Sequence, residues 1–290
     1  MKFNNSKFLT IIKVLIIILS ITYFIYFVFQ NRNFFSDLKE IGLIIILMLF
    51  LMKILNIMFL SNINLRILKY LNINLTLSES VMITTKNSIG NLSSPFKLGS
   101  GYKISYLKEN YDLNIKNYIL LNSFFAILNI FPIVLLFLSY GATLSLFENL
   151  VTSIFVISIC ILIFIFSFKL SIKSNFLGSL DFLNYDNALI QINNLMFFIS
   201  NCIIVYLIAI QFNSDISFFS SVAFTTLGSF VNLINLTPGN IGIKESILLI
   251  FNGLHGYSLY MLIFISFLER FLSFVALFLI QFIQSVRLNN

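Results

Sequence analysis

The chain of 290 residues is poor in the residues that most catalytic and metal sites require. It has one histidine, His255, and two cysteines, Cys160 and Cys202, which both lie in apolar runs. A structural zinc site needs several closely spaced cysteine or histidine ligands, and a Ser-His-Asp constellation needs a positioned histidine. We therefore expect no metal, no cofactor and no enzymatic activity.

Charged residues are also scarce, at 10% of the chain against roughly 25% in a soluble domain. This composition excludes an ordinary soluble fold. Hydrophobic residues make up 59% of the chain, and the mean hydropathy is +0.97, so we predict an all-α polytopic membrane protein. The net charge of +7 is distributed between apolar runs rather than gathered in one patch. It indicates loops that face anionic membrane lipids and gives no support for a nucleic-acid partner.

The hydrophobic pattern predicts six full transmembrane helices, because a helix needs about 20 apolar residues to cross the bilayer. The six segments lie at about 8–29, 41–60, 117–139, 149–169, 189–211 and 257–283. Two further segments, 77–109 and 216–254, are interrupted by polar residues, glycine and proline. Irregular backbone at membrane depth is tolerated only where protein or water surrounds it. We predict that these two segments form re-entrant or broken helical hairpins.

The basic residues predict how these elements are oriented. With both hairpins returning to the side they came from, twelve of the 18 lysines and arginines are cytoplasmic, and three (Arg32, Lys39 and Lys244) are on the outer side. This asymmetry satisfies the positive-inside rule. The apolar run 8–29 is long enough to span and precedes no small-residue cleavage site. We therefore expect an uncleaved first span and two cytoplasmic termini.

The two interrupted segments carry related short sequences about half the chain length apart. Ser94-Pro95-Phe96-Lys97-Leu98-Gly99 and Thr237-Pro238-Gly239-Asn240-Ile241-Gly242 both place Ser or Thr before Pro and Gly four residues after it. Each half then holds three crossings and one hairpin, and an odd number of crossings inverts the second half. We predict one transmembrane domain, 1–290, built from inverted repeats at about 1–140 and 141–290, as in many secondary transporters.

Charged residues follow the break in each half. Lys97 and Lys103 flank Gly99 in the first, and Lys244-Glu245 follows Gly242 in the second. A helix N-terminus with a nearby lysine suits a phosphate or carboxylate. The alternative is that these lysines only extend to the membrane interface.

Glu269-Arg270 lies near the middle of the last span, where ionisable residues are costly and usually paired. Adjacent helical residues diverge by about 100°, so each needs its own partner. We expect Lys244 to pair with Glu269, and Glu245 with Arg270. The alternative role is a static ion pair that fastens the second hairpin to the last helix. Lys53 is interpreted as a residue near the end of its span that reaches the interface.

These motifs resemble those of the transmembrane region of lysylphosphatidylglycerol synthases and of related stand-alone flippase-like membrane proteins. The similarity lies in Ser94-Pro95-Phe96-Lys97-Leu98-Gly99 with Lys103, in the segment from Thr237 to Glu245, and in Glu269-Arg270. The resemblance implies translocation or handling of an anionic phospholipid or a polyprenyl-linked lipid in the cytoplasmic (inner) membrane of a bacterium or archaeon. It does not imply lysyl transfer, because that reaction belongs to a soluble domain after the membrane region and this chain ends at Asn290.

The expected functional site is a central polar cavity that binds a lipid headgroup, and membrane lipids are the expected partners. Its predicted lining or bracing residues are Pro238, Gly239, Gly242, Lys244, Glu245, Glu269 and Arg270, with Pro95, Lys97, Gly99 and Lys103 as the cytoplasmic counterpart. The leading function is that of a lipid flippase-like transporter. The alternative is a non-transporting accessory subunit of a lipid-modifying or glycosyl-transferring membrane enzyme.

Overall fold

The structure is a computed structural model that describes residues 41–94, 97–126, 185–212, 216–234, 240, 244 and 259–289. Regular structure within these residues is entirely helical. The helices are α3 (Leu43–Lys69), α4 (Leu77–Ser93), α5 (Leu98–Tyr111), α9 (Tyr185–Ala209), α10 (Phe218–Ile234) and α12 (Leu259–Asn289). A further helical stretch covers residues 115–126. The predicted all-α class is confirmed for the described part of the chain.

Three helices are long and apolar enough to cross a membrane, namely Leu43–Lys69, Tyr185–Ala209 and Tyr260–Val286 within α12. At 1.5 Å per residue each is about 38–40 Å long, which exceeds the hydrocarbon core of about 30 Å. They correspond to the spans predicted at 41–60, 189–211 and 257–283. The spans predicted at 8–29 and 149–169 lie outside the described residues. Of the span predicted at 117–139, residues up to 126 are described, and they are helical.

Helix α3 continues nine residues beyond the predicted end of its span, through a polar stretch. The helix persists there because α9 supplies polar partners. Arg66 and Lys69 both bind Asp186, at 2.5 and 2.7 Å, and Asn62 Nδ2 donates to Asn193 Oδ1 at 3.2 Å. The apolar run therefore underestimates the length of the helix.

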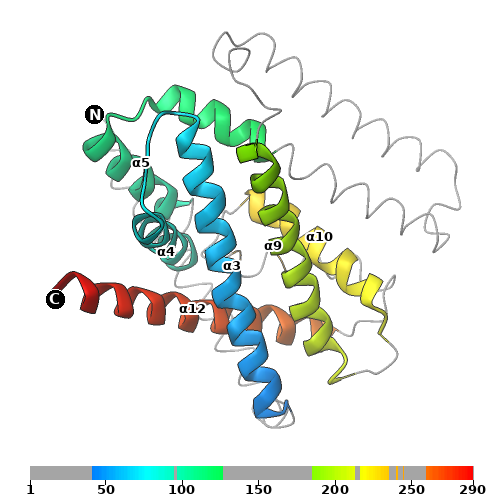
Figure 1. Cartoon of the computed structure of the whole chain (residues 1–290). Helices are drawn as coiled ribbons and strands as arrows, with labels where there is room; N and C mark the ends of the chain where they lie inside the picture. Colours follow the sequence, from blue (N-terminus) through cyan, green and yellow to red (C-terminus); the bar gives the residue numbers. More distant parts are fainter. Residues whose placement is uncertain are drawn as a thin grey trace, which may run out of the picture.

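Helices α3 and α9 lie side by side, and α12 crosses them (Figure 1). The largest group of buried apolar side chains joins α3, α9, α10 and α12, with Leu49, Ile208, Phe224 and Phe264 among its members. Between lipid-embedded helices, close van der Waals packing and interhelical hydrogen bonds drive association. The α3–α9 seam contains both kinds of contact.

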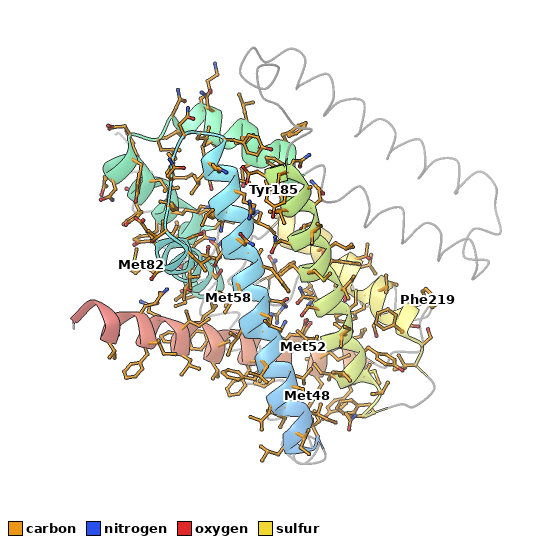
Figure 2. The ribbon with its side chains drawn as sticks, viewed as in Figure 1. Met48, Met52, Met58, Met82, Tyr185 and Phe219 are labelled. Carbon is orange, nitrogen blue, oxygen red and sulfur yellow. The ribbon has the colours of Figure 1, made fainter. Side chains whose placement is uncertain are left out.

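The helices expose many large apolar side chains and bury several polar or charged ones beside the apolar core. Every fourth residue of α3 from Leu43 to Leu55 is an exposed leucine, whereas the same helix buries Lys53 and Asn56. Figure 2 labels two further outward side chains, Met48 on α3 and Phe219 on α10, which are 54% and 59% exposed. Exposed apolar faces and buried charged residues differ from a soluble fold and suit a lipid surround.

Helices α4 and α5 form an antiparallel hairpin. Near its closed end a Cβ placed on Gly90 would lie 2.6 Å from Gly99 Cα, and at its open end Tyr106 and Tyr111 both donate to Glu79 Oε1, at 3.0 and 2.5 Å. The bond to Glu79 raises the pKa of Tyr111 to about 12, so its hydroxyl remains a donor in mildly alkaline solution as well as at neutral pH. The helices have 17 and 14 residues, or about 26 and 21 Å. Each is shorter than the hydrocarbon core.

The chain reverses in this hairpin where the sequence predicts a break. Helix α4 ends at Ser93, Ser94 is extended, and Lys97 has a left-handed backbone with φ 54° before α5 begins. Pro95 lies between these positions, outside the described residues. The first predicted hairpin is therefore an antiparallel helical pair in the described residues.

We expect Gly99→Ala to destabilise the hairpin by about 1–3 kcal/mol, the range for overpacking a tight interior. A Cβ at Gly99 would overlap the main chain of α4 at Asn87 and Asn91, and main-chain atoms cannot move aside. Gly101→Ala, on the same helix, meets nothing within 4 Å and should gain about 0.5–1 kcal/mol from helix propensity. Thermal unfolding of the purified variants in detergent tests both. A Gly99→Ala protein as stable as Gly101→Ala would contradict the close packing.

The second predicted hairpin, 216–254, is described only in part. Helix α10, Phe218–Ile234, accounts for its first arm. Of residues 235–258, the structure describes Asn240 and Lys244. The rest of the return arm and of its motif lies outside the described residues.

Candidate functional site

A charged cluster joins three distant parts of the chain. The Glu269 carboxylate on α12 binds Lys53 of α3 through Oε1 at 3.2 Å and Lys244 through Oε2 at 2.8 Å. The side chains of Lys53, Glu269 and Lys244 are 8%, 11% and 14% exposed. The expected pairing of Lys244 with Glu269 is confirmed. The cluster carries one more positive than negative charge.

The two lysines of this cluster also contact neutral groups. Lys53 Nζ donates to Asn201 Oδ1 on α9 at 3.3 Å. The Lys244 ammonium lies 5.2 Å from the centre of the Phe224 ring on α10. A Cβ at Gly228 would lie 3.1 Å from Lys244 Cε, so the missing side chain makes room for the lysine. Helices α3, α9, α10 and α12 therefore all position the cluster.

Arg270 points away from its neighbour Glu269, as helical geometry requires. Its Nη2 donates to the main-chain oxygen of Asn240 at 3.3 Å. Asn240 is buried and has a left-handed backbone with φ 58°. The partner predicted for Arg270, Glu245, lies outside the described residues.

These groups line a cavity of about 580 Å³. Its charged lining residues are Lys53, Lys97, Lys244, Glu269 and Arg270. Four cations therefore face one carboxylate within the described lining. Amides and hydroxyls from α3, α4, α5, α9, α10 and α12 complete the polar part, and phenylalanines of α9 and α10 contribute an apolar part. A site with this composition favours an anionic group attached to an apolar body.

The residues predicted in the first hairpin are divided between two places. Lys97 and the adjacent Ser100 line the cavity at the N-terminus of α5. Gly99 instead packs between the arms of the hairpin. Lys103 is 6% exposed, and its Nζ donates to Asn64 Oδ1 at 2.6 Å. It lies 5.3 Å from the centre of the Tyr118 ring. Lys103 thus neither extends to the interface nor lines the cavity.

The structure describes Lys97, Gly99, Lys103, Lys244, Glu269 and Arg270 among the predicted site residues. Four of them, Lys97, Lys244, Glu269 and Arg270, line one cavity although they come from both halves of the sequence. Pro95, Pro238, Gly239, Gly242 and Glu245 lie outside the described residues.

Sequence reasoning assigned the wrong position to Lys53 and overlooked Asn56 and Asn201. Lys53 was expected to reach the interface, but it is 7% exposed and binds Glu269. Its helix extends to Lys69, which puts it near the middle of the helix rather than near the end. An ionisable residue within an apolar run is itself a signal for a buried partner. Lys53, Asn56 and Asn201 are all polar residues within apolar runs, and they belong to one hydrogen-bonded network.

The fold and the site define an integral membrane protein whose helices surround a cation-rich polar cavity. The chain matches the family described as the lysylphosphatidylglycerol synthase TM region over residues 10–280, and it belongs to that family. The match covers both predicted motifs and all the described cavity residues. The chain matches no curated protein and no solved structure.

Proposed function

We propose that this protein binds the headgroup of an anionic phospholipid or polyprenyl-linked lipid in the cavity and moves the lipid between leaflets. The observation that carries the proposal is the charge of the cavity, where Lys53, Lys97, Lys244 and Arg270 exceed the single carboxylate of Glu269. Burying a cation away from water is unfavourable unless a counter-charge compensates it. A phosphate supplies that charge, and the apolar part of the lining suits the lipid beside it.

The bonds made by the Glu269 carboxylate favour a binding role over a catalytic one. Both of its carboxylate oxygens are engaged by lysines. A general base must be free to accept a proton from a reacting group. We therefore propose that the protein transports or presents lipid without chemically changing it, and that membrane lipids are its partners.

The proposed membrane arrangement has six crossings and two re-entrant hairpins, arranged as inverted repeats in the cytoplasmic membrane. The short α4–α5 hairpin and the three long apolar helices support this arrangement. Lys244 projects into the cavity, so it no longer counts among the outer charges, and the positive-inside asymmetry becomes stronger.

We expect both termini to face the cytoplasm. Single cysteines at positions 2 and 289 should be labelled by a membrane-impermeant thiol reagent only after the membrane is opened. The background should lack Cys160 and Cys202. Labelling of either position from outside intact cells would contradict the arrangement. A structure in which 216–254 crosses the bilayer as one unbroken helix would contradict the repeat.

The experiment that tests the function is leaflet-resolved lipid transport. Purified protein is reconstituted into vesicles with a headgroup-labelled anionic lipid, and the label in the outer leaflet is quenched by a membrane-impermeant reductant. Transport makes the inner-leaflet label accessible over time, whereas empty vesicles retain a protected fraction. Binding of the anionic lipid without transport would favour the accessory-subunit alternative.

A further inference from the structure

Asn56 is a polar group of the cavity that the charged cluster does not use. It lies on α3 less than one turn from Lys53, is 4% exposed and lines the cavity. Its Nδ2 donates to Asn201 Oδ1 on α9 at 3.1 Å. Its Oδ1 is buried and accepts no hydrogen bond from the residues that the structure describes.

The surrounding bonds fix which way this amide points. Asn201 Nδ2 donates to the main-chain oxygen of Phe197 at 2.8 Å, which turns Asn201 Oδ1 toward α3. That oxygen accepts from Lys53 Nζ and from Asn56 Nδ2. Exchanging the nitrogen and oxygen of Asn56 would bring two acceptors together. The Asn56 oxygen is therefore left as the unused acceptor.

A buried acceptor without a donor is unfavourable, and in a binding site it is a position that a ligand can satisfy. The donor could be a hydroxyl or an ammonium group. Because cations exceed carboxylates in the described lining, an ammonium group would be repelled, whereas a neutral hydroxyl would not. The phosphate and the hydroxyl would then be recognised by different residues of one cavity.

We propose that Asn56 is a specificity-determining residue that selects lipids whose phosphodiester headgroup carries a hydroxyl. This inference rests on the proposed function, in which the cations hold the phosphate. The cations select the negative charge, and the Asn56 oxygen distinguishes a hydroxylated headgroup from a simple alkyl phosphodiester of equal charge.

The test compares three lipids with identical acyl chains by native mass spectrometry of the purified full-length protein. Phosphatidylglycerol has a phosphodiester and hydroxyls, phosphatidylmethanol has the same charge without a hydroxyl, and phosphatidylcholine is zwitterionic. Both anionic lipids should bind more tightly than phosphatidylcholine. Phosphatidylglycerol should exceed phosphatidylmethanol by about fivefold, the factor that corresponds to one hydrogen bond.

A matched pair of variants assigns the preference to Asn56. Asn56→Leu should reduce the ratio of phosphatidylglycerol to phosphatidylmethanol binding to about one and keep the preference for anionic lipids. Asn62→Leu removes an equivalent α3–α9 amide bond, since Asn62 Nδ2 donates to Asn193 Oδ1, but Asn62 does not line the cavity. That variant should keep the wild-type ratio. If Asn56→Leu does not fold, equal binding of the two anionic lipids to the wild-type protein would still overturn the proposal.

The outcomes distinguish a failure of this inference from a failure of the proposed function on which it rests. Equal binding of the two anionic lipids, both above phosphatidylcholine, would overturn the role of Asn56 and leave the proposed function intact. Equal binding of all three lipids would overturn the anionic-lipid site itself. Soluble glycerophosphoglycerol, the deacylated headgroup, should not displace phosphatidylglycerol at equal concentration. Displacement would assign the site to a soluble phosphodiester and overturn the lipid proposal.

Discussion

Replacing Glu269 by glutamine is expected to destabilise the folded protein by about 3–5 kcal/mol, the range for breaking a buried ion pair. Glu269 is the shared partner of Lys53 and Lys244, at 3.2 and 2.8 Å, and all three side chains are largely buried. Glutamine keeps the size of the side chain but not its charge. Two buried ammonium groups would then lack their counter-charge and repel each other.

The effect is measured as the loss of folded protein on heating, followed by size-exclusion chromatography in detergent. Asp186→Asn is the matched control, because Asp186 also binds two cations, Arg66 and Lys69. The side chain of Lys69 is 55% exposed, so water can replace its partner, whereas those of Arg66 and Asp186 are 19% and 17% exposed. The expected destabilisation is therefore smaller than for Glu269→Gln, about 1–2 kcal/mol. Equal destabilisation by the two variants would contradict the buried character of the Glu269 cluster.

Replacing all three charged residues of the cluster should destabilise the protein less than replacing Glu269 alone. In the triple variant Lys53→Met, Lys244→Met and Glu269→Gln, no charge of the cluster remains buried. Replacing buried ion pairs by apolar residues of similar volume is often neutral for stability. The triple variant should therefore recover most of the thermal stability that Glu269→Gln loses, and it should lose anionic-lipid binding. Stability as low as in the single variant would show that the carboxylate acts through something other than charge compensation.

The sequence predicted those parts of the site that follow from one feature that is unfavourable within a membrane. A carboxylate in the last span required a cation, and the structure confirms the expected pairing with Lys244. The proline and glycines of 77–109 predicted a reversal, and α4 and α5 form an antiparallel pair around it. Both inferences use the rule that unpaired charges, and backbone N–H and C=O groups without hydrogen bonds, are unfavourable away from water.

The parts that sequence reasoning missed depend on how separate helices align. The end of α3 was misplaced because the apolar run stops before Asn62, Arg66 and Lys69 find their partners on α9. That error moved Lys53 from the middle of a helix to near its end. The bond from Asn56 to Asn201 likewise depends on the register of α3 against α9. One sequence contains no direct information on that register, since each asparagine taken alone is also compatible with an ordinary helix surface.

Arg270→Ala is expected to reduce lipid transport by about 10–100-fold while the protein still inserts and folds. A hydrogen bond to a charged group contributes about 1.5–3 kcal/mol, which corresponds to this range of rates. Arg270 lines the cavity beside Lys244 and Glu269. Its Nη2 donates to the main-chain oxygen of Asn240, and the geometry of a guanidinium fork matches a phosphate. Arg270→Ala leaves the bonds of Glu269 to Lys53 and Lys244 in place, so its effect on stability should be smaller than that of Glu269→Gln.

Two further variants identify what the arginine does. Arg270→Lys keeps the charge but loses the fork, so transport should be intermediate if the guanidinium holds a phosphate in two-point contact. Arg66→Ala is the control, because Arg66 also carries an ion pair on a long helix but does not line the cavity. It should leave transport within about twofold of wild type, since the Asp186 carboxylate keeps Lys69 as a partner.

The decisive comparison concerns Glu245, the acidic residue predicted to pair with Arg270. If Arg270 only balances that carboxylate, removing both charges should restore transport that either single variant loses, because no uncompensated charge remains. If Arg270 binds the lipid phosphate, the double variant Glu245→Ala with Arg270→Ala should remain as inactive as Arg270→Ala alone. We expect the second result, measured as leaflet-resolved transport at equal amounts of folded protein in the vesicles. Restoration of transport in the double variant would make Arg270 a structural partner and leave phosphate binding to the three lysines of the cavity.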